Sequence, residues 1–295
     1  MSVTLLGASE IRRLAAELDV TPTKKLGQNF VVDANTVRRI VQIARVGEGD
    51  QVVEVGPGLG SLTLAILEAG ASVTAVEIDH RLASRLPETA REHGVAEGAL
   101  TVVDADALRV TELPGDPRVL VANLPYNVSV PVLLHLLEHF ADLERGVVMV
   151  QAEVGERLAA PPGSKVYGAP SVKAAWYGTW RLAGLVSRQV FWPVPNVDSV
   201  LVAFERDPRP RGSEEDRRAV FAIVDAAFQQ RRKMLRQALA AVLGGTAADA
   251  SAILIAAGVA PTARGEELGI DEFERIAAAL RQASPGTPGI VSLEG

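Results

Sequence analysis

The chain has 295 residues, of which 48% are hydrophobic and 22% are charged, so one large or two moderate globular domains are expected. The absence of cysteine excludes disulfides, thiolate metal sites and a cysteine nucleophile. A formal net charge of −6 argues against a nucleic-acid-binding protein when the chain is taken whole, although segregated charges can reverse that conclusion locally. The sequence has no recognisable signal peptide and no long apolar run, so a cytoplasmic enzyme is expected.

The first 44 residues predict two short helices separated by a polar arm. Residues 9–18 are amphipathic, and residues 33–44 regain helical spacing after Asp33 or Asn35, either of which can cap the helix. Between these helices, residues 21–30 are polar and have no period, which is typical of a loop or an arm.

The following segment has the pattern of a nucleotide-binding unit. Residues 51–55 predict a strand that runs directly into Gly56-Pro-Gly-Leu-Gly60, where glycines let the backbone approach a ligand closely. A second strand, residues 72–79, ends in acids, and Glu77 is placed to accept hydrogen bonds from ribose hydroxyls. The spacing G-x-G-x-G is more typical of S-adenosylmethionine sites than of dinucleotide sites, which leaves a nicotinamide oxidoreductase as the alternative.

Two further predicted strands also end in polar residues. Residues 100–103 are followed by Asp104-Ala-Asp-Ala107, and residues 119–122 are followed by Asn123-Leu-Pro-Tyr126. An aspartate at such a position can bind the adenine amine of a cofactor or can cap a helix. Because open α/β sheets bind ligands at the carboxyl ends of their strands, the glycine loop and these strand ends are expected to meet in one crevice.

The turn at Asn123 suits recognition of an amino group. Pro125 lacks an N–H and restrains Leu124, so the Leu124 carbonyl and the Asn123 side chain can face one group that carries two hydrogens. Tyr126 can lie against a flat ring, because aromatic side chains stack favourably on bases. An adenine presented by its exocyclic amine fits this description, and an ordinary strand-to-helix turn is the alternative.

Histidine spacing gives no support for a metal site. His135 and His139 lie four residues apart, but the pair lacks the glutamate of the H-E-x-x-H motif. Residues 133–140 therefore predict an ordinary helix, and no metal is expected.

The second half of the chain predicts the end of the sheet and then a small helical domain. Residues 146–150 predict a strand, residues 152–159 a helix, residues 165–173 a loop, and residues 174–180 and 199–204 closing strands. Helices are expected at residues 214–243, 248–257 and 271–283, followed by a disordered Pro/Gly-rich tail at 284–295. The expected domains are thus residues 1–207 and 208–283.

Basic residues are concentrated near the start of this helical domain. Residues 181–236 contain 11 basic and 7 acidic side chains, a local charge of +4. Such a run is either a solvated helix face or a phosphate-binding surface. The candidates for phosphate contacts are Lys24, Lys25, Arg231, Arg232, Lys233 and Arg236.

Seven motifs, in order, give the chain a resemblance to the ribosomal RNA adenine dimethyltransferases along nearly its whole length. They are Lys24-Lys-Leu-Gly-Gln-Asn-Phe30, Glu54-Val-Gly-Pro-Gly-Leu-Gly60, Val76-Glu-Ile-Asp79, Asp104-Ala-Asp-Ala107, Asn123-Leu-Pro-Tyr-Asn127, Phe191-Trp-Pro-Val-Pro-Asn-Val-Asp-Ser199 and Phe228-Gln-Gln-Arg-Arg-Lys233. The resemblance implies a Rossmann-like α/β methyltransferase sheet that uses S-adenosylmethionine, with a small all-helical C-terminal domain. It also implies dimethylation of two adjacent adenosines near the 3′ end of small-subunit ribosomal RNA, in an assembling subunit.

The resemblance also implies roles for individual residues. The cofactor would be held by Gln28, Asn29, the backbone at Val31, Gly56 under its methionine part, Gly58, Glu77 at the ribose, Asp106 at the adenine, and Asn123. The target base would be oriented by Asn123 and the Leu124 carbonyl and sandwiched by Tyr126 and Phe191.

Two other functions remain open at this stage. One is methylation of adenine in large-subunit RNA, as in enzymes that confer macrolide resistance, although the Gln-Arg-Arg-Lys segment and the length favour the small-subunit enzyme. The other is a role as a ribosome-assembly factor whose binding matters more than its methylation. A monomer is expected.

Overall fold

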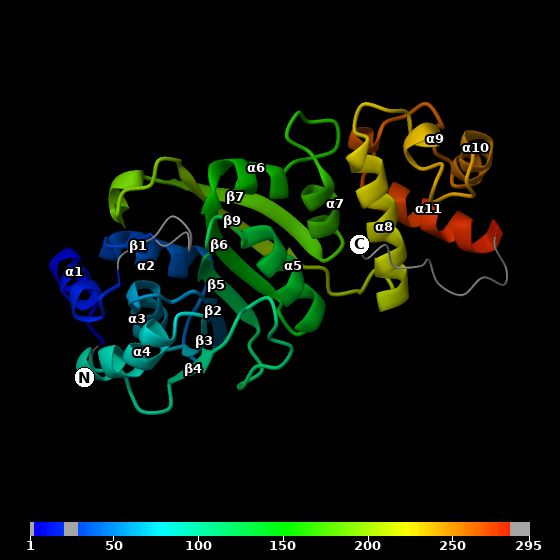
Figure 1. Ribbon diagram of the computed structural model, residues 1–295. Helices are drawn as coiled ribbons and strands as arrows, with labels where there is room; N and C mark the ends of the chain where they lie inside the picture. The colour runs from blue at the N-terminus through cyan, green and yellow to red at the C-terminus, as the bar shows by residue number, and fades with distance from the viewer. Residues whose placement is uncertain (1–2, 21–28, 284–295) are drawn as a thin grey trace. The chain divides into compact units, whose positions relative to one another are not determined.

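The computed structural model describes residues 3–20 and 29–283 (Figure 1). These residues form two compact units, one containing the described residues up to 156 and residues 179–208, the other containing residues 157–178 and 209–283. The expected boundary near residue 207 therefore needs one correction, because residues 157–178 pack with the helical unit. Within that unit, Tyr167 lies edge-on against Phe228, and Trp176 lies edge-on against Phe221. No helix in residues 3–20 or 29–283 is long and apolar enough to cross a membrane.

The first unit is built on a seven-stranded sheet. Its strand order is β4 (Leu100–Asp104), β3 (Ser72–Glu77), β2 (Gln51–Val55), β5 (Val119–Asn123), β6 (Arg145–Gln151), β9 (Ser199–Arg206) and β7 (Gly178–Val186). Strands β4 to β6 run parallel, and β9 runs antiparallel to β6. From β2 the chain adds β3 and β4 on one side, and it then returns to add β5 and β6 on the other side of β2. The carboxyl ends of β2 and β5 are therefore the topological switch point of the sheet.

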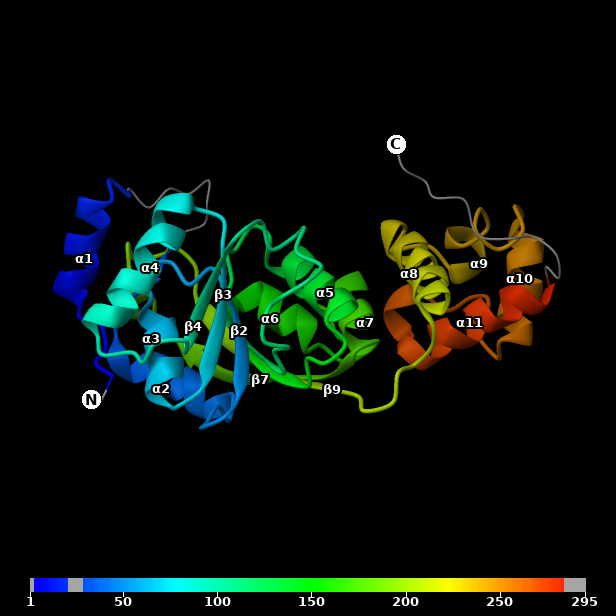
Figure 2. The ribbon, with the colours of Figure 1, turned by 90° about the horizontal axis from the view of Figure 1, so that it is seen from below.

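Helices cover both faces of this sheet. Figure 2 shows α2 (Ala34–Ile43), α3 (Ser61–Glu68) and α4 (His80–Glu92) on one side and α5 (Ser129–His139) on the other. Strands covered on both faces are expected to be apolar throughout. In agreement, β5 is fully buried from Val119 to Ala122. Val119 and Val121 of β5 and Val52 of β2 belong to the core cluster that also contains residues of α2 and α3. The expected Rossmann-like sheet is confirmed.

The start of the chain forms the two predicted helices, α1 (Ala8–Glu17) and α2. Asp33 caps α2, because its carboxylate accepts the backbone N–H of Thr36 at 2.7 Å. Between the helices, the short strand β1 (Phe30–Val31) pairs antiparallel with β8 (Phe191–Trp192), which follows the 3-10 turn η1 (Arg188–Val190). No sequence pattern predicts this pairing, because each strand has only two residues.

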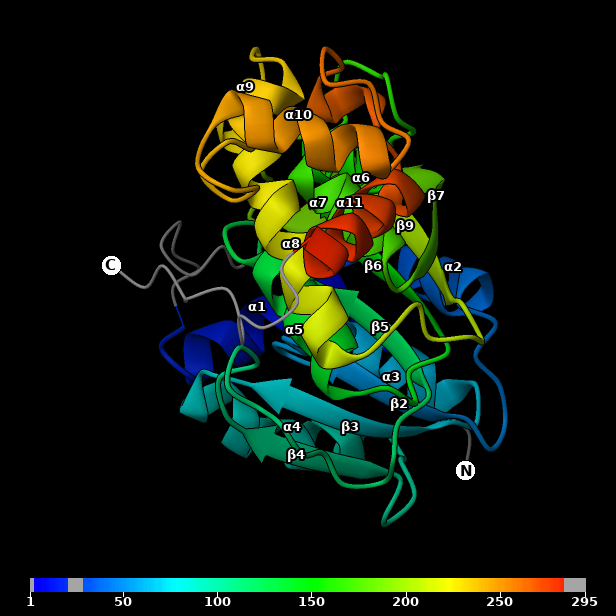
Figure 3. The same cartoon turned by 90° about the vertical axis from the view of Figure 1, so that its right-hand side faces the viewer.

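The second unit is helical, as expected, but its boundaries differ. Helix α6 (Ala152–Leu158) leads into α7 (Ala169–Ala175), α8 (Glu214–Gln229), α9 (Leu235–Ala238), α10 (Ala247–Ala256), the 3-10 turn η2 (Gly265–Glu267) and α11 (Ile270–Ala283). Figure 3 shows α11 crossing α8 and lying beside α10, and both pairs are in contact. The loop expected at 165–173 is confirmed only up to Gly168, because α7 begins at Ala169 with Pro170 in its first turn. The strand expected at 174–180 is confirmed only from Gly178, where β7 begins.

The helix expected at residues 214–243 begins at Glu214 as expected, but its predicted end is wrong. Helix α8 ends at Gln229, and the backbone N–H groups of Leu235 and Arg236 bond instead to the carbonyls of Ala263 and Pro261. The basic residues at 231–233 therefore lie in a turn between α8 and α9. The tail expected at 284–295 lies outside the described residues.

Candidate functional site

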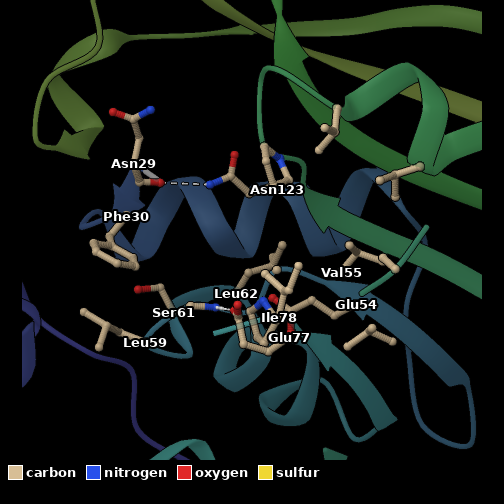
Figure 4. Close-up of a pocket in the computed structure, with 18 of the residues that line it drawn as sticks. Asn29, Phe30, Glu54, Val55, Leu59, Ser61, Leu62, Glu77, Ile78 and Asn123 are labelled. Carbon is tan, nitrogen blue, oxygen red and sulfur yellow. Dashed lines mark hydrogen bonds between the residues drawn. The ribbon is translucent and has the colours of Figure 1, made fainter. Parts of the chain in front are cut away.

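A pocket opens at the carboxyl ends of the four strands β2 to β5, with β1 on one side (Figure 4). The structure brings seven of the predicted cofactor residues to its lining: Asn29, Val31, Gly56, Gly58, Glu77, Asp106 and Asn123. These residues come from β1 and from the four strand ends, so they are far apart in the sequence and meet only through the parallel pairing of the sheet. The predicted Gln28 lies outside the described residues.

The glycine loop after β2 has the conformation that glycine permits. Gly56 and Gly58 have φ values of 68° and 58°, in the left-handed region that side chains disfavour. A Cβ atom at Gly58 would also lie 2.9 Å from the ring of Phe30. The N–H of Gly58 donates to a carboxylate oxygen of Glu77 at 3.1 Å, which joins the loop to the end of β3. The loop is thus held close to the pocket on both sides.

Glu77 is a buried acceptor at the position expected for a ribose contact. It is 4% exposed and also accepts the backbone N–H of Asp79 at 3.0 Å. Burial raises the pKa of Glu77, and the backbone hydrogen bonds from Asp79 and Gly58 oppose that rise. A carboxylate has about four acceptor positions, so these two bonds leave capacity for ribose hydroxyls.

Glu54 is a second buried acid in the pocket. Its side chain is 1% exposed and accepts a hydrogen bond from the Thr63 hydroxyl at 2.6 Å. Burial raises the pKa of Glu54 to about 8, the Thr63 bond lowers it, and the nearby charge of Glu77 raises it. Glu54 is therefore neutral at pH 7. The sequence signal for it is an acid inside an otherwise apolar predicted strand.

The far end of the pocket combines Asp106 with an apolar surface. Asp106 accepts the N–H of Leu108 at 2.9 Å, so it closes a turn and still faces the pocket. Ile78 follows Glu77 and is 61% exposed although it is apolar, which suits contact with a flat ring. No sequence signal identifies Ile78, because exposure at a strand end is a property of the fold.

The amide of Asn123 has a fixed orientation. Its Nδ2 donates to the backbone carbonyl of Asn29 at 3.0 Å, as the dashed line in Figure 4 shows. A carbonyl can only accept, so the NH₂ group must face Asn29 and the side-chain oxygen must face away. The next residue, Leu124, donates its backbone N–H to the Met149 carbonyl at 3.1 Å, which continues the pairing of β5 with β6.

Leu124, Tyr126 and Phe191 do not line this pocket. Leu124 is buried at 1% exposure, and the hydroxyl of Tyr126 shares a hydrogen bond of 2.6 Å with Ser199. Burial raises the pKa of Tyr126, while the bond to Ser199 lowers it. Phe191 is 2% exposed because β8 carries its ring into the core that also contains Val31. The sandwich of a target base by Tyr126 and Phe191 stays a prediction.

The predicted phosphate contacts are unequally placed. Lys24 and Lys25 lie outside the described residues. Arg231 is bonded to Glu266 at 2.7 Å and to the Lys165 carbonyl at 2.9 Å, so its charge is partly compensated. Arg232 and Lys233 are exposed in the turn after α8, and Arg236 is partly exposed in α9.

The pocket fits the adenosine and methionine parts of S-adenosylmethionine. The glycine loop provides close backbone approach, Glu77 provides acceptors for two hydroxyls, and Asp106 provides an acceptor for an amine. The pocket fits a dinucleotide less well, because the glycine spacing is G-x-G-x-G. In addition, the charged side chains that the described residues contribute to the lining are all acidic, and acidic groups repel a pyrophosphate.

Substitution of Glu54 by Gln should flatten the pH dependence of stability. Glu54 keeps its proton in the folded state up to about pH 8, whereas an unfolded glutamate loses it near its ordinary pKa of about 4.3. The folded state therefore binds more protons between these values, and wild-type stability falls as pH rises through that window, on the order of a few kcal/mol. Urea unfolding of wild type and Glu54→Gln from about pH 5 to pH 9 should give curves that agree at the acid end and diverge at the alkaline end. Parallel curves would contradict the assignment.

Comparison with known proteins identifies the family of this chain. Residues 21–282 match the family described as ribosomal RNA adenine dimethylase. The ribosomal RNA small subunit methyltransferase A of Leifsonia xyli subsp. xyli is 69% identical over 275 residues, covering 93% of this chain and 98% of that protein. The protein of the same name from Thermobifida fusca is 62% identical, covering 92% and 95%.

Solved structures show the same architecture. The 23S rRNA methyltransferase ErmE is 27% identical with a TM-score of 0.64, covering 86% of this chain and 100% of that one. A dimethyladenosine transferase from Plasmodium falciparum has a TM-score of 0.71 at 23% identity, covering 83% and 94%, and so shares the fold. The resemblance inferred from the seven motifs is confirmed, and S-adenosylmethionine is the cofactor. The chain belongs to the ribosomal RNA adenine dimethylase family.

Proposed function

We propose that this protein transfers methyl groups from S-adenosylmethionine to the exocyclic amines of two adjacent adenosines near the 3′ end of small-subunit ribosomal RNA. It does so as a monomer, in the cytoplasm, on an assembling small subunit. The observation that carries the proposal is the Asn123 amide, whose oxygen is held at the switch point of the sheet beside the cofactor pocket. The high sequence identity to small subunit methyltransferase A proteins, over nearly the whole chain, supports small-subunit ribosomal RNA as the substrate.

The chain's part in the reaction is to position the amine. When bound, the cofactor would supply an activated methyl group: the methyl–sulfur bond breaks as the nitrogen–methyl bond forms, and S-adenosylhomocysteine leaves. The positively charged nitrogen then releases its proton to water, so no strong base is needed. The Asn123 oxygen and the Leu124 carbonyl each accept a hydrogen bond from one N–H of the amine. These two bonds direct the nitrogen lone pair toward the methyl group. Two such acceptors also favour the pyramidal, more nucleophilic form of the amine. Positioning of this kind lowers the activation barrier by an amount on the order of several kcal/mol.

The target adenosine reaches the site out of its base stack. Enzymes that modify bases take the nucleotide out of the helix or act on single strands. Tyr126, half-buried beside Ser199, offers one stacking surface. Phe191 is 2% exposed, so its ring must leave the core before it can stack on the base. We propose that RNA binding causes this movement.

The RNA itself is held through its phosphates by basic side chains outside the pocket. Arg232 and Lys233 are exposed at the end of α8, and Arg236 lies close by in α9. Lys24, Lys25 and Arg231 complete the set of proposed contacts. Exposed cations bind phosphate by releasing counterions, which makes affinity depend steeply on salt.

The substrate is tested by methyl transfer to ribosomal subunits that lack the modification. Purified protein and labelled S-adenosylmethionine should place dimethyladenosine at two neighbouring positions near the 3′ end of the small-subunit RNA. Label in large-subunit RNA would instead support the second candidate, which the 27% identity to ErmE favours. Binding of immature subunits without transfer would leave a role in assembly only.

The fixed amide is tested by Asn123→Asp. A neutral carboxyl group can donate to the Asn29 carbonyl and accept from the amine, but a carboxylate can only accept and is repelled by the carbonyl. Activity of the variant should therefore rise, relative to wild type, as pH falls from about 9 to about 5. Asn123→Ala should be about 100-fold less active at every pH. An Asn123→Asp activity that keeps a constant ratio to wild type would show that the bond to Asn29 has no role.

The phosphate contacts are tested by the double variant Arg232→Ala/Lys233→Ala. Loss of two phosphate contacts should weaken RNA binding and reduce the slope of log K against log salt by about 2. Cofactor affinity should not change, because neither residue lines the pocket. The control is the double variant Arg91→Ala/Glu97→Ala, at two exposed positions of the sheet-containing unit, which should bind RNA as wild type does. An unchanged salt slope in the first variant would exclude these contacts.

A further inference from the structure

Residues 3–20 precede the family match, which begins at residue 21, and they pack against the wall of the cofactor pocket. Helix α1 buries Ile11 at 0% and Leu14 at 1% exposure. Both side chains belong to one apolar cluster with Phe30 and Leu59, and these two residues line the pocket. The inner surface of the site is therefore backed by a segment that precedes the residues matched by the family.

Phe30 transmits this contact to the glycine loop. Its ring lies against Gly58, so closely that a Cβ atom there would be 2.9 Å from it. On another side it stacks on Trp192, with ring centroids 6.3 Å apart. Leu59, the next residue of the loop, is 3% exposed in the same cluster. The position of the loop thus depends on how well α1 fills the space behind Phe30 and Leu59.

Hydrogen bonds also fasten the beginning of this segment to α4, which lies alongside α1 in Figure 2. The N–H of Thr4 donates to the His93 carbonyl at 3.0 Å, and the Thr4 hydroxyl lies 3.0 Å from Nδ1 of His93. On the other side of the ring, Nε2 lies 3.4 Å from the Glu10 carboxylate. His93, at 9% exposure, is a buried anchor for the start of α1.

The end of the segment is linked to the pocket by a second route. The Asp19 carbonyl accepts a hydrogen bond from Arg81 at 2.9 Å. Arg81 also donates to the Asp79 carboxylate at 2.7 Å, and the N–H of Asp79 donates to Glu77 at 3.0 Å. A continuous chain of hydrogen bonds therefore joins the turn after α1 to the acid expected at the ribose.

We propose that residues 3–20 act as a brace that holds the cofactor pocket in its binding-competent shape. They determine cofactor affinity without touching the cofactor, through Phe30 and Leu59 on the apolar side and through Arg81 on the polar side. The proposal rests on the proposed function only in taking S-adenosylmethionine and its product as the ligands. The brace sets the fraction of molecules whose pocket is competent, and the apparent dissociation constant varies inversely with that fraction.

The test compares two buried leucines in the full-length chain. Leu14→Ala removes the centre of the brace, whereas Leu254→Ala makes the same change in α10 of the helical unit, where Leu254 is 0% exposed. Both should lower the unfolding midpoint. Binding of S-adenosylhomocysteine is measured by titration calorimetry at a temperature at which circular dichroism shows that all the proteins are folded. The dissociation constant of Leu14→Ala should be about tenfold higher than that of wild type, because the fraction of molecules with a competent pocket falls. Leu254→Ala should bind as wild type does.

A second pair covers the case in which Leu14→Ala does not fold. Arg81→Met breaks the link between Asp19 and Asp79, and Arg85→Met, one turn later in α4, removes a cation whose partners are Glu88 and Glu92. Only Arg81→Met should weaken binding. Wild-type affinity in the folded brace variants, or equal losses in brace and control variants, would overturn the proposal. Failure of the wild-type protein to bind S-adenosylhomocysteine would overturn the proposed function itself.

Discussion

The pairing of β2 with β5 is the constraint on which the rest of the site depends. Val52 lies opposite Val119 and Val53 opposite Leu120, so the glycine loop and the Asn123 turn leave the sheet side by side. Parallel pairing places both carboxyl ends at the same edge, and the reversal of strand order leaves that edge open for a ligand. The glycine loop and Asn123, the residue proposed to orient the amine, are therefore neighbours because of sheet topology.

Burial gives the site its chemical character. Glu54 and Glu77 lie buried near the carboxyl ends of β2 and β3, where each has few polar partners, and burial raises the pKa of each. The two acids differ in their partners, because Glu54 has one hydroxyl donor and Glu77 has two backbone donors. Glu54 can therefore keep its proton at pH 7 beside Glu77, which accepts backbone N–H groups. Two like charges in so small a space would otherwise repel.

Much of the fold and part of the site can be predicted from the sequence, because the relevant signals are local. Glycine spacing, apolar strands and polar strand ends indicate Gly56, Glu77 and Asn123 from the sequence pattern, whereas the choice of Asp106 over Asp104 depends on the family resemblance. The orientation of the Asn123 amide cannot be predicted, because its partner is the carbonyl of Asn29, 94 residues away. The same holds for the exposure of Ile78 and the burial of Phe191, which depend on neighbours brought by the sheet. Helix α7 is missed because Gly168 and Pro170 suggest a loop, whereas Pro170 occupies the first turn of the helix.

The central claim is that the carboxyl ends of β2, β3, β4 and β5 form one cofactor site. Hydrogen–deuterium exchange with and without S-adenosylhomocysteine tests it most directly. Binding should slow exchange at residues 56–60, 77–79, 104–107 and 123–126 together, because one ligand contacts all four strand ends. Protection confined to the helical unit, or to one strand end without the others, would contradict the claim.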